Sequence, residues 1–248
     1  MALPLADRVA LVTGAGSGIG KAIALHLADL GAHVIVNDKL IDSEAEGVAE
    51  EIRRLGRKAI VVEADVTRRV DVFDMVERGE IALGPIDVLI NNVGGLIERK
   101  PFLEHTDDLW DSLMDLNLKS AMLCAQAVLP GMIERKRGQI VNISSIAAET
   151  GGPAGSIAYA AAKGGMNTLT IGLAREVAEH GIRVNAVSPG LIDTPFHAGN
   201  ERSFRERIAA IPMGRIGEPE EVARVVGFVV SEKAGFMTGQ VLTVSGGR

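Results

Sequence analysis

The sequence has few of the residues on which several common classes of protein depend. It contains one cysteine, Cys124, so no disulfide can form within the chain, and this fits a reducing cytosol. Aromatic residues are scarce, with one Trp, one Tyr and six Phe, and the formal net charge is −6. Neither stacking platforms nor a basic stripe is present, so we expect no nucleic-acid partner.

Long hydrophobic runs and metal-ligand patterns are also missing. The uncharged run 150–162 is rich in glycine and alanine, and every uncharged run is shorter than the about 20 apolar residues needed to cross a bilayer. The N-terminal MALPLADR lacks the pattern of a signal peptide. We therefore expect a cytoplasmic protein without a membrane partner. No Cys-x-x-Cys occurs, and no histidine pair has zinc-ligand spacing among His26, His33, His105, His180 and His197. No metal site is expected.

What is present is a regular alternation of short apolar strands and helices. The 248 residues are 47% hydrophobic, enough for one substantial core. Expected strands are VALV, HVIV, AIVV, DVLI, QIVNI, RVNAV and QVLTV, with helices after the first glycine turn and near 43–55, 70–80, 117–134 and 159–180. This pattern predicts an α/β fold: a doubly wound, Rossmann-type, mostly parallel seven-stranded sheet with helices on both faces.

We expect residues 1–248 to form a single dinucleotide-binding domain that also carries the catalytic site. One segment breaks the alternation of strands and helices. Residues 191–214 are polar and rich in turn formers, including Pro195, Gly199 and Pro212. We expect this insert to be a mobile lid over the substrate.

The first strand leads directly into TGAGSGIG, a glycine turn that opens a helix. Glycine marks many tight turns, but Gly14, Gly18 and Gly20 lie between a strand and a helix, where backbone N–H groups can face a diphosphate. Their spacing, G-x-x-x-G-x-G, differs from the general G-x-G-x-x-G pattern. The turn predicts a dinucleotide site.

Asp38 ends the second strand about 20 residues beyond this turn, where an acid can bind the adenosine ribose hydroxyls. A carboxylate there repels the 2′-phosphate of NADP, and Ser17 supplies no cation for that phosphate. NAD is therefore the expected cofactor. Lys39 can partly neutralise the repulsion, so NADP stays possible. The alternative interpretation is that Asp38 only begins a turn.

Tyr159 and Lys163 lie four residues apart on one expected helix, in YAAAK. A tyrosine titrates near 10 in water, and a nearby lysine stabilises the phenolate and lowers that pKa toward a range useful for moving a hydroxyl proton. Ser144 and Ser145 end the strand before this helix. A hydroxyl at that place can hydrogen-bond the oxygen of a carbonyl substrate.

With these motifs in order, the whole chain resembles the classical short-chain dehydrogenase/reductase family. TGAGSGIG is similar to its cofactor turn, NNVG at 91–94 to its NNAG motif, and SPGLIDT from Ser188 to its P-G motif. Val93 replaces the family's usual alanine. The interval from Ser145 to Tyr159 is about one residue longer than is common, which leaves Ser144 as an alternative to Ser145, although VNISS favours the second serine.

The resemblance implies a catalytic tetrad of Asn117, Ser145, Tyr159 and Lys163. In it Tyr159 is the acid/base, Ser145 polarises the carbonyl, Lys163 lowers the Tyr159 pKa and binds the nicotinamide ribose, and Asn117 supports a water relay to Lys163. The implied cofactor-binding residues are Gly14, Ser17, Gly18, Ile19, Gly20, Asp38, Asp65, Val66, Asn91, Gly94, Tyr159, Lys163, Pro189, Gly190, Ile192 and Thr194. Among these, Asp65 and Val66 would bind adenine, and Ile192 and Thr194 would contact the carboxamide and phosphates.

The motifs do not name the substrate. A small polar alcohol, sugar, sugar acid or polyol is favoured by Asp38 and the polar insert, and Arg99 with Lys100 could favour an anionic one. An alternative is a 3-oxoacyl-carrier-protein reductase, suggested by GFMTGQVLTVSGG and by the basic run Arg135–Arg137 with Arg175. A non-catalytic dinucleotide-binding regulator is a third hypothesis, which the complete tetrad disfavours. The resemblance also implies a homotetramer or homodimer formed through the two long helices.

Overall fold

The computed structural model describes residues 3–39, 43–194, 206 and 208–248. Seven parallel strands form one sheet in the order β3-β2-β1-β4-β5-β6-β7. The strands are β1 (Val9–Val12), β2 (His33–Asp38), β3 (Ala59–Glu63), β4 (Val88–Asn91), β5 (Gly138–Ile143), β6 (Ile182–Pro189) and β7 (Val241–Val244). The predicted doubly wound parallel sheet is confirmed.

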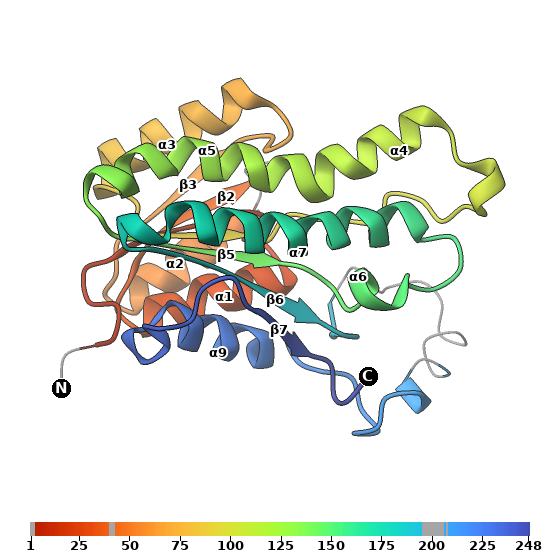
Figure 1. Ribbon diagram of the computed structural model, residues 1–248. Helices are drawn as coiled ribbons and strands as arrows, with labels where there is room; N and C mark the ends of the chain where they lie inside the picture. Colours follow the sequence, from red (N-terminus) through yellow and green to blue (C-terminus); the bar gives the residue numbers. More distant parts are fainter. Residues whose placement is uncertain (1–2, 40–42, 195–205, 207) are drawn as a thin grey trace.

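Helices cover both faces of the sheet (Figure 1). They are α1 (Gly18–Asp29), α2 (Ser43–Arg54), α3 (Arg69–Leu83), α4 (Asp107–Met114), α5 (Ser120–Glu134), α6 (Ala147–Thr150), α7 (Ile157–Val177) and α9 (Pro219–Val230). One core lies between the sheet and α1, α2 and α9, and the other lies between the sheet and α3, α5 and α7. Because both faces of the sheet are buried, its central strands are apolar throughout rather than alternating.

Two elements differ from the sequence-based expectation. The expected helices do not include α9, which begins with Pro219 at its first turn and a reciprocal capping box between Glu218 and Glu221. The helix expected at 117–134 begins earlier, because α4 runs into α5 through a π-helical turn at Asp115–Lys119. That turn carries Asn117.

The stretch Asp107–Glu134 has the length and mean hydropathy, 1.2, of a possible membrane span. Its apolar side chains nevertheless pack inside the protein: Leu123, Cys124, Val128 and Met132 of α5 belong to the core shared with α3 and α7. The apolar character of this stretch is therefore explained by the core of the fold.

The strand order reverses between β1 and β4, because β1 continues to β2 on one side while β4 continues to β5 on the other. In open parallel sheets ligands bind outside the carboxyl ends of the strands at such a switch point. The turns after β1 and β4 are TGAGSGIG and NNVG. The topology therefore brings these two motifs together.

Candidate active site

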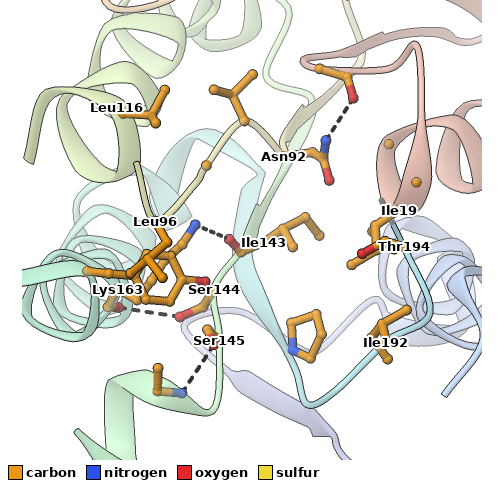
Figure 2. Close-up of a pocket in the computed structure, with 18 of the residues that line it drawn as sticks. Ile19, Asn92, Leu96, Leu116, Ile143, Ser144, Ser145, Lys163, Ile192 and Thr194 are labelled. Atoms are coloured by element: carbon orange, nitrogen blue, oxygen red, sulfur yellow. Dashed lines mark hydrogen bonds between the residues drawn. The ribbon is translucent and has the colours of Figure 1, made fainter. Parts of the chain in front are cut away.

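A cavity of about 700 Å³ lies over the carboxyl ends of the strands (Figure 2). That volume is within the usual range for a small-molecule or cofactor site. Most of the expected site residues line it: Gly14, Ser17, Gly18, Ile19, Gly20, Asp38, Asp65, Val66, Gly94, Ser145, Tyr159, Lys163, Pro189, Gly190, Ile192 and Thr194. These residues come from the carboxyl ends of six strands and from the turns and helices that follow them, so only the folded sheet assembles the site.

Two expected residues do not line the cavity. Asn91 is buried in β4, where its Nδ2 donates to Asn142 Oδ1 at 2.8 Å. The next residue, Asn92, lines the cavity instead and donates through Nδ2 to the carbonyl oxygens of Thr13 and Gly14. Successive side chains of a strand point to opposite faces, so the strand orientation decides which asparagine faces the turn. The expected cleft-lining role of Asn91 is therefore corrected to Asn92.

Asn117 is the second residue outside the lining, and it lies directly behind it. Its Oδ1 accepts from Gly95 N at 2.9 Å, and its Nδ2 donates to Gly95 O at 2.8 Å. A Cβ atom on Gly94 would lie 2.8 Å from both Asn117 Oδ1 and Lys163 Nζ. The π-helical turn thus aims the Asn117 amide at the loop after β4, close to the Lys163 ammonium.

The glycine turn is built for close approach to the backbone. Gly14 has φ +60°, a left-handed conformation that favours glycine, and a Cβ atom on Gly20 would collide with the Gly14 carbonyl oxygen. Ser17 precedes α1 and forms no side-chain cap. The first N–H groups of a helix have no partner within the helix, so those of α1 are available to an anion in the cavity.

Asp38 is held against the glycine turn. Its Oδ2 accepts from Gly16 N at 3.1 Å, and its Oδ1 accepts from Lys39 N at 2.7 Å. The carboxylate lines the cavity at the end of β2. Its negative charge is therefore fixed beside the glycine turn by two backbone donors.

Lys39 directs its charge elsewhere: its Nζ lies 2.8 Å from Asp65 Oδ2. Burial raises the pKa of Asp65, but hydrogen bonds from Lys39 and Thr67 outweigh it and lower that pKa to about 2. Asp65 is therefore ionised at neutral pH and holds the Lys39 ammonium. In this arrangement the Lys39 charge neutralises Asp65 rather than Asp38.

Lys163 is almost fully buried, with 2% of its surface exposed. Its Nζ donates to Ile143 O at 2.8 Å (Figure 2). Burial lowers the pKa of Lys163 to about 8. The ammonium is thus buried away from water with one backbone partner. Burying a charge in this way costs free energy, and it is unusual unless the charge has a function.

Tyr159 is partly buried and packs against Leu109 and Leu113 of α4. Burial raises its pKa, while a side-chain hydrogen bond with Ser145 acts in the opposite direction. The Lys163 Nζ lies 5.9 Å from the centre of the Tyr159 ring. In this structure burial has the largest effect on the Tyr159 pKa, and the Lys163 ammonium bonds a backbone carbonyl. The lowering of the Tyr159 pKa by Lys163 stays a prediction.

The two candidate serines have different environments. Ser145 lines the cavity with Tyr159 and acts to lower its pKa, and the Ser145 Oγ accepts from Ala147 N at 3.1 Å. Ser144 is buried, and its Oγ donates to Lys163 O at 3.3 Å, in the backbone of α7. The geometry therefore favours Ser145 as the hydroxyl that meets a substrate, and Ser144 as a tether for α7.

Several lining residues carried no sequence signal. Apolar side chains from several loops and helices also line the cavity: Leu96, Leu116, Ile146, Ala147, Pro153 and Leu191. Only Leu191 lies in a quoted motif, SPGLIDT, since isolated apolar residues look like packing residues in a sequence. The expected lid, 191–214, lies partly outside the described residues; of it, Leu191, Ile192 and Thr194 line the cavity.

Other polar clusters in the described part of the chain do not resemble metal sites: no group of three or more His, Cys, Asp and Glu side chains is placed to hold an ion. Burial raises the pKa of Cys124 to about 12, as expected for an inert thiol packed in the core. His197 lies outside the described residues.

Comparison with known proteins places the chain among dehydrogenases and reductases. Residues 14–248 match the family model described as enoyl-(acyl carrier protein) reductase. The chain is 41% identical to (2S)-((R)-hydroxy(phenyl)methyl)succinyl-CoA dehydrogenase subunit BbsD of Thauera aromatica, over 98% of this chain and 96% of that protein. It is 40% identical to 3-oxoacyl-(acyl-carrier-protein) reductase FabG of Thermotoga maritima, over 98% of both chains.

A third relative is cis-4-hydroxycyclohexanecarboxylate dehydrogenase of Sinomonas cyclohexanicum, 41% identical over 98% of this chain and 96% of that protein. Among solved structures, a short-chain alcohol dehydrogenase from Sinorhizobium meliloti, described as putative, superimposes with a TM-score of 0.94 at 34% identity, covering 100% of this chain and 98% of that one. The similarity extends over almost the whole chain.

Proposed function

The chain belongs to the short-chain dehydrogenase/reductase family and is an oxidoreductase acting on CH–OH groups, and from that premise we propose that it transfers a hydride between NAD and a secondary alcohol or ketone carbon. The observation that carries this proposal is that Tyr159 and Ser145 line the same cavity, beside the buried Lys163. Such a group of side chains suits proton transfer to or from a substrate oxygen.

The lining fits a nicotinamide dinucleotide. The glycine turn and the N-terminus of α1 suit the diphosphate, Asp38 suits the adenosine ribose, and Asp65 with Val66 suits adenine. Pro189, Gly190, Ile192 and Thr194 line the same cavity and would contact the nicotinamide side of the cofactor. When bound, the cofactor supplies the acceptor or donor of the hydride.

The remaining chemistry belongs to side chains of this protein. In the oxidative direction the Tyr159 phenolate takes the hydroxyl proton of the substrate as the hydride leaves the same carbon, and the hydroxyl becomes a carbonyl. Ser145 donates a hydrogen bond to that oxygen and holds it near Tyr159. Lys163 stabilises the phenolate and exchanges the proton with solvent, and Asn117 supports that relay through the loop at Gly95.

NAD rather than NADP is our proposal for the cofactor. Asp38 places a fixed carboxylate beside the ribose position, and Lys39 is paired with Asp65. The Asp38 carboxylate would repel the 2′-phosphate of NADP, and the Lys39 ammonium would not offset that repulsion. Steady-state kinetics with both cofactors test this, and a lower KM for NADP would overturn it.

For the substrate we propose a small polar molecule: a sugar, a sugar acid or a polyol. Reduced-cofactor formation over a panel of polyols, sugars, hydroxy acids and hydroxyacyl thioesters tests it. Turnover confined to the thioesters would replace this proposal with the alternative, a 3-oxoacyl-carrier-protein reductase. Similarity to FabG favours that alternative.

Within one subunit, the position of the basic run Arg135–Arg137 does not support the 3-oxoacyl-carrier-protein reductase. Arg135 donates to Ile86 O, and Arg137 pairs with the buried Asp87. Both arginines precede β5, at the edge of the sheet opposite the cavity. An acidic carrier bound there would not lie next to this chain's own Tyr159.

We also propose a homotetramer or homodimer in the cytoplasm. Assembly through α5 and α7 would use long helices with small residues such as Gly172, which faces open space. Light scattering at working concentration tests the assembly, and a monomer would contradict it.

A further inference from the structure

The cavity has an uneven distribution of charge. Asp38, Lys39 and Asp65 lie together at its adenosine end, and the two acids there are the only acidic side chains among the described lining residues. The remaining charged lining residues are all cations: Arg99, Lys163 and Arg248. Lys163 is buried and bonds a backbone carbonyl. Arg99 and Arg248 are exposed, so the part of the cavity away from Asp38 and Asp65 presents positive charge to a substrate.

Arg99 is held close to the catalytic helix by the backbone on either side of it. At the start of its loop both backbone groups of Gly95 bond the Asn117 amide. One residue after Arg99, Lys100 N donates to Gly155 O at 3.2 Å, in the turn that precedes α7. Arg99 therefore lies in the loop after β4, next to the point where this loop contacts the turn that leads to Tyr159.

A strained turn lies between these two anchors. Ile97 has φ 54°, a left-handed conformation that is unusual for a β-branched residue. The turn is closed by Glu98 N donating to Leu96 O at 2.6 Å. Backbone of this kind is strained and is found mainly at functional sites. Here the turn brings both Leu96 and Arg99 to the cavity.

The neighbours of Arg99 leave its charge available. Glu98, the nearest acid in the sequence, pairs with Lys100 at 3.2 Å. Within the part of the chain that the structure describes, no acidic side chain forms an ion pair with Arg99. Its guanidinium can therefore bind a carboxylate on a ligand, and a planar guanidinium forms two parallel hydrogen bonds with such a group.

We propose that Arg99 binds a carboxylate of the substrate, so that the preferred substrate is a hydroxy acid, or the matching oxo acid, with an apolar body. The apolar body would contact Leu96, Leu116, Ile146 and Leu191 around the same end of the cavity. This inference rests on the proposed hydride transfer and changes the expected substrate, since an acid with an apolar body would be preferred to a neutral sugar or polyol.

A pair of non-reacting ligands tests the proposal and does not require the substrate to be identified. The enzyme is saturated with NADH, and cyclohexanecarboxylate or cyclohexanecarboxamide is titrated into it by calorimetry. The two ligands have the same ring, and only the first carries a charge at pH 7. We expect the acid to bind about tenfold more tightly than the amide, as a charge-assisted bidentate contact allows.

Two variants test whether Arg99 causes the preference for the acid over the amide. Arg99→Gln should remove the preference for the acid and leave the weak binding of the amide unchanged. Lys100→Gln removes the adjacent cation, which does not line the cavity, and should keep the preference. Both variants should bind NADH like the unmodified protein, because neither residue contacts the proposed cofactor site.

Equal binding of the two ligands, failure of the acid to bind, or an acid preference that survives Arg99→Gln would overturn the proposal. In each case NADH binding and turnover of a neutral alcohol would still stand, so the proposed function would be unaffected. If NADH itself does not bind, both the proposed function and this inference are wrong.

Discussion

Lys163 is the residue at which burial and charge oppose each other most strongly. Its pKa falls from the ordinary value of 10.5 to about 8 because burial disfavours the ammonium. Between these two values the unfolded chain keeps a proton that the folded chain releases, so stability rises with pH across this window. Below about pH 8 the cost of the buried charge is present in full.

This cost predicts a stabilising substitution at the active site. Lys163→Met keeps the side-chain length and removes the charge, so the free energy of unfolding at pH 7 should increase by about 1 to 3 kcal/mol, although Ile143 O loses a donor. The gain should shrink as the pH rises from 8 to 10.5. Urea denaturation at several pH values measures it. A loss of stability at pH 7 would show that the buried charge is well compensated.

At the scale of elements, a buried polar chain ties α7 to the sheet. Asn91 donates to Asn142, and Asn142 Nδ2 donates to Thr170 Oγ1 at 2.8 Å. Thr170 in turn donates to Met166 O, one turn earlier in α7. This chain fixes the position of the helix that carries Tyr159 and Lys163. Asn91 therefore has a structural role, although it does not line the cavity.

Thr170→Val should break this chain. The valine has a similar shape but leaves Asn142 Nδ2 without its acceptor, so we expect a loss of about 1 to 3 kcal/mol in the free energy of unfolding. Thr168→Val is the matched control, because Thr168 also bonds a carbonyl four residues earlier but is exposed. It should change stability by less than about 0.5 kcal/mol. Similar losses in both variants would contradict the account.

How well the sequence predicts an element depends on what kind of pattern it leaves. The parallel strands are predictable because burial on both faces makes them short apolar runs between helices. α9 is harder to recognise, because its run of valines has strand-like composition and only Pro219 with the capping box marks its start. The choice between Asn91 and Asn92 depends on strand orientation. Contacts between distant loops, such as Lys100 with Gly155, leave no local pattern.

At the scale of the whole molecule, a cofactor that binds the folded chain should stabilise it. A ligand at 100 times its Kd adds about 2.7 kcal/mol by mass action, which raises the Tm of a protein of this size by about 5 to 10 °C. NAD should therefore raise the Tm more than NADP at equal concentration, because of Asp38. Differential scanning calorimetry with each cofactor measures both shifts. A larger shift with NADP would contradict the proposed selectivity.

Acid/base catalysis by Tyr159 is the central claim of this account. Tyr159→Phe removes the hydroxyl and keeps the ring that packs against Leu109 and Leu113, so the fold and NADH binding should be preserved. The direct measurement is kcat for NAD-dependent oxidation of the best substrate in the panel, for this variant and the unmodified enzyme, with NADH binding measured on both. We expect kcat to fall by about 10²- to 10⁴-fold. A variant that binds NADH and turns over at a near-normal rate would contradict the claim.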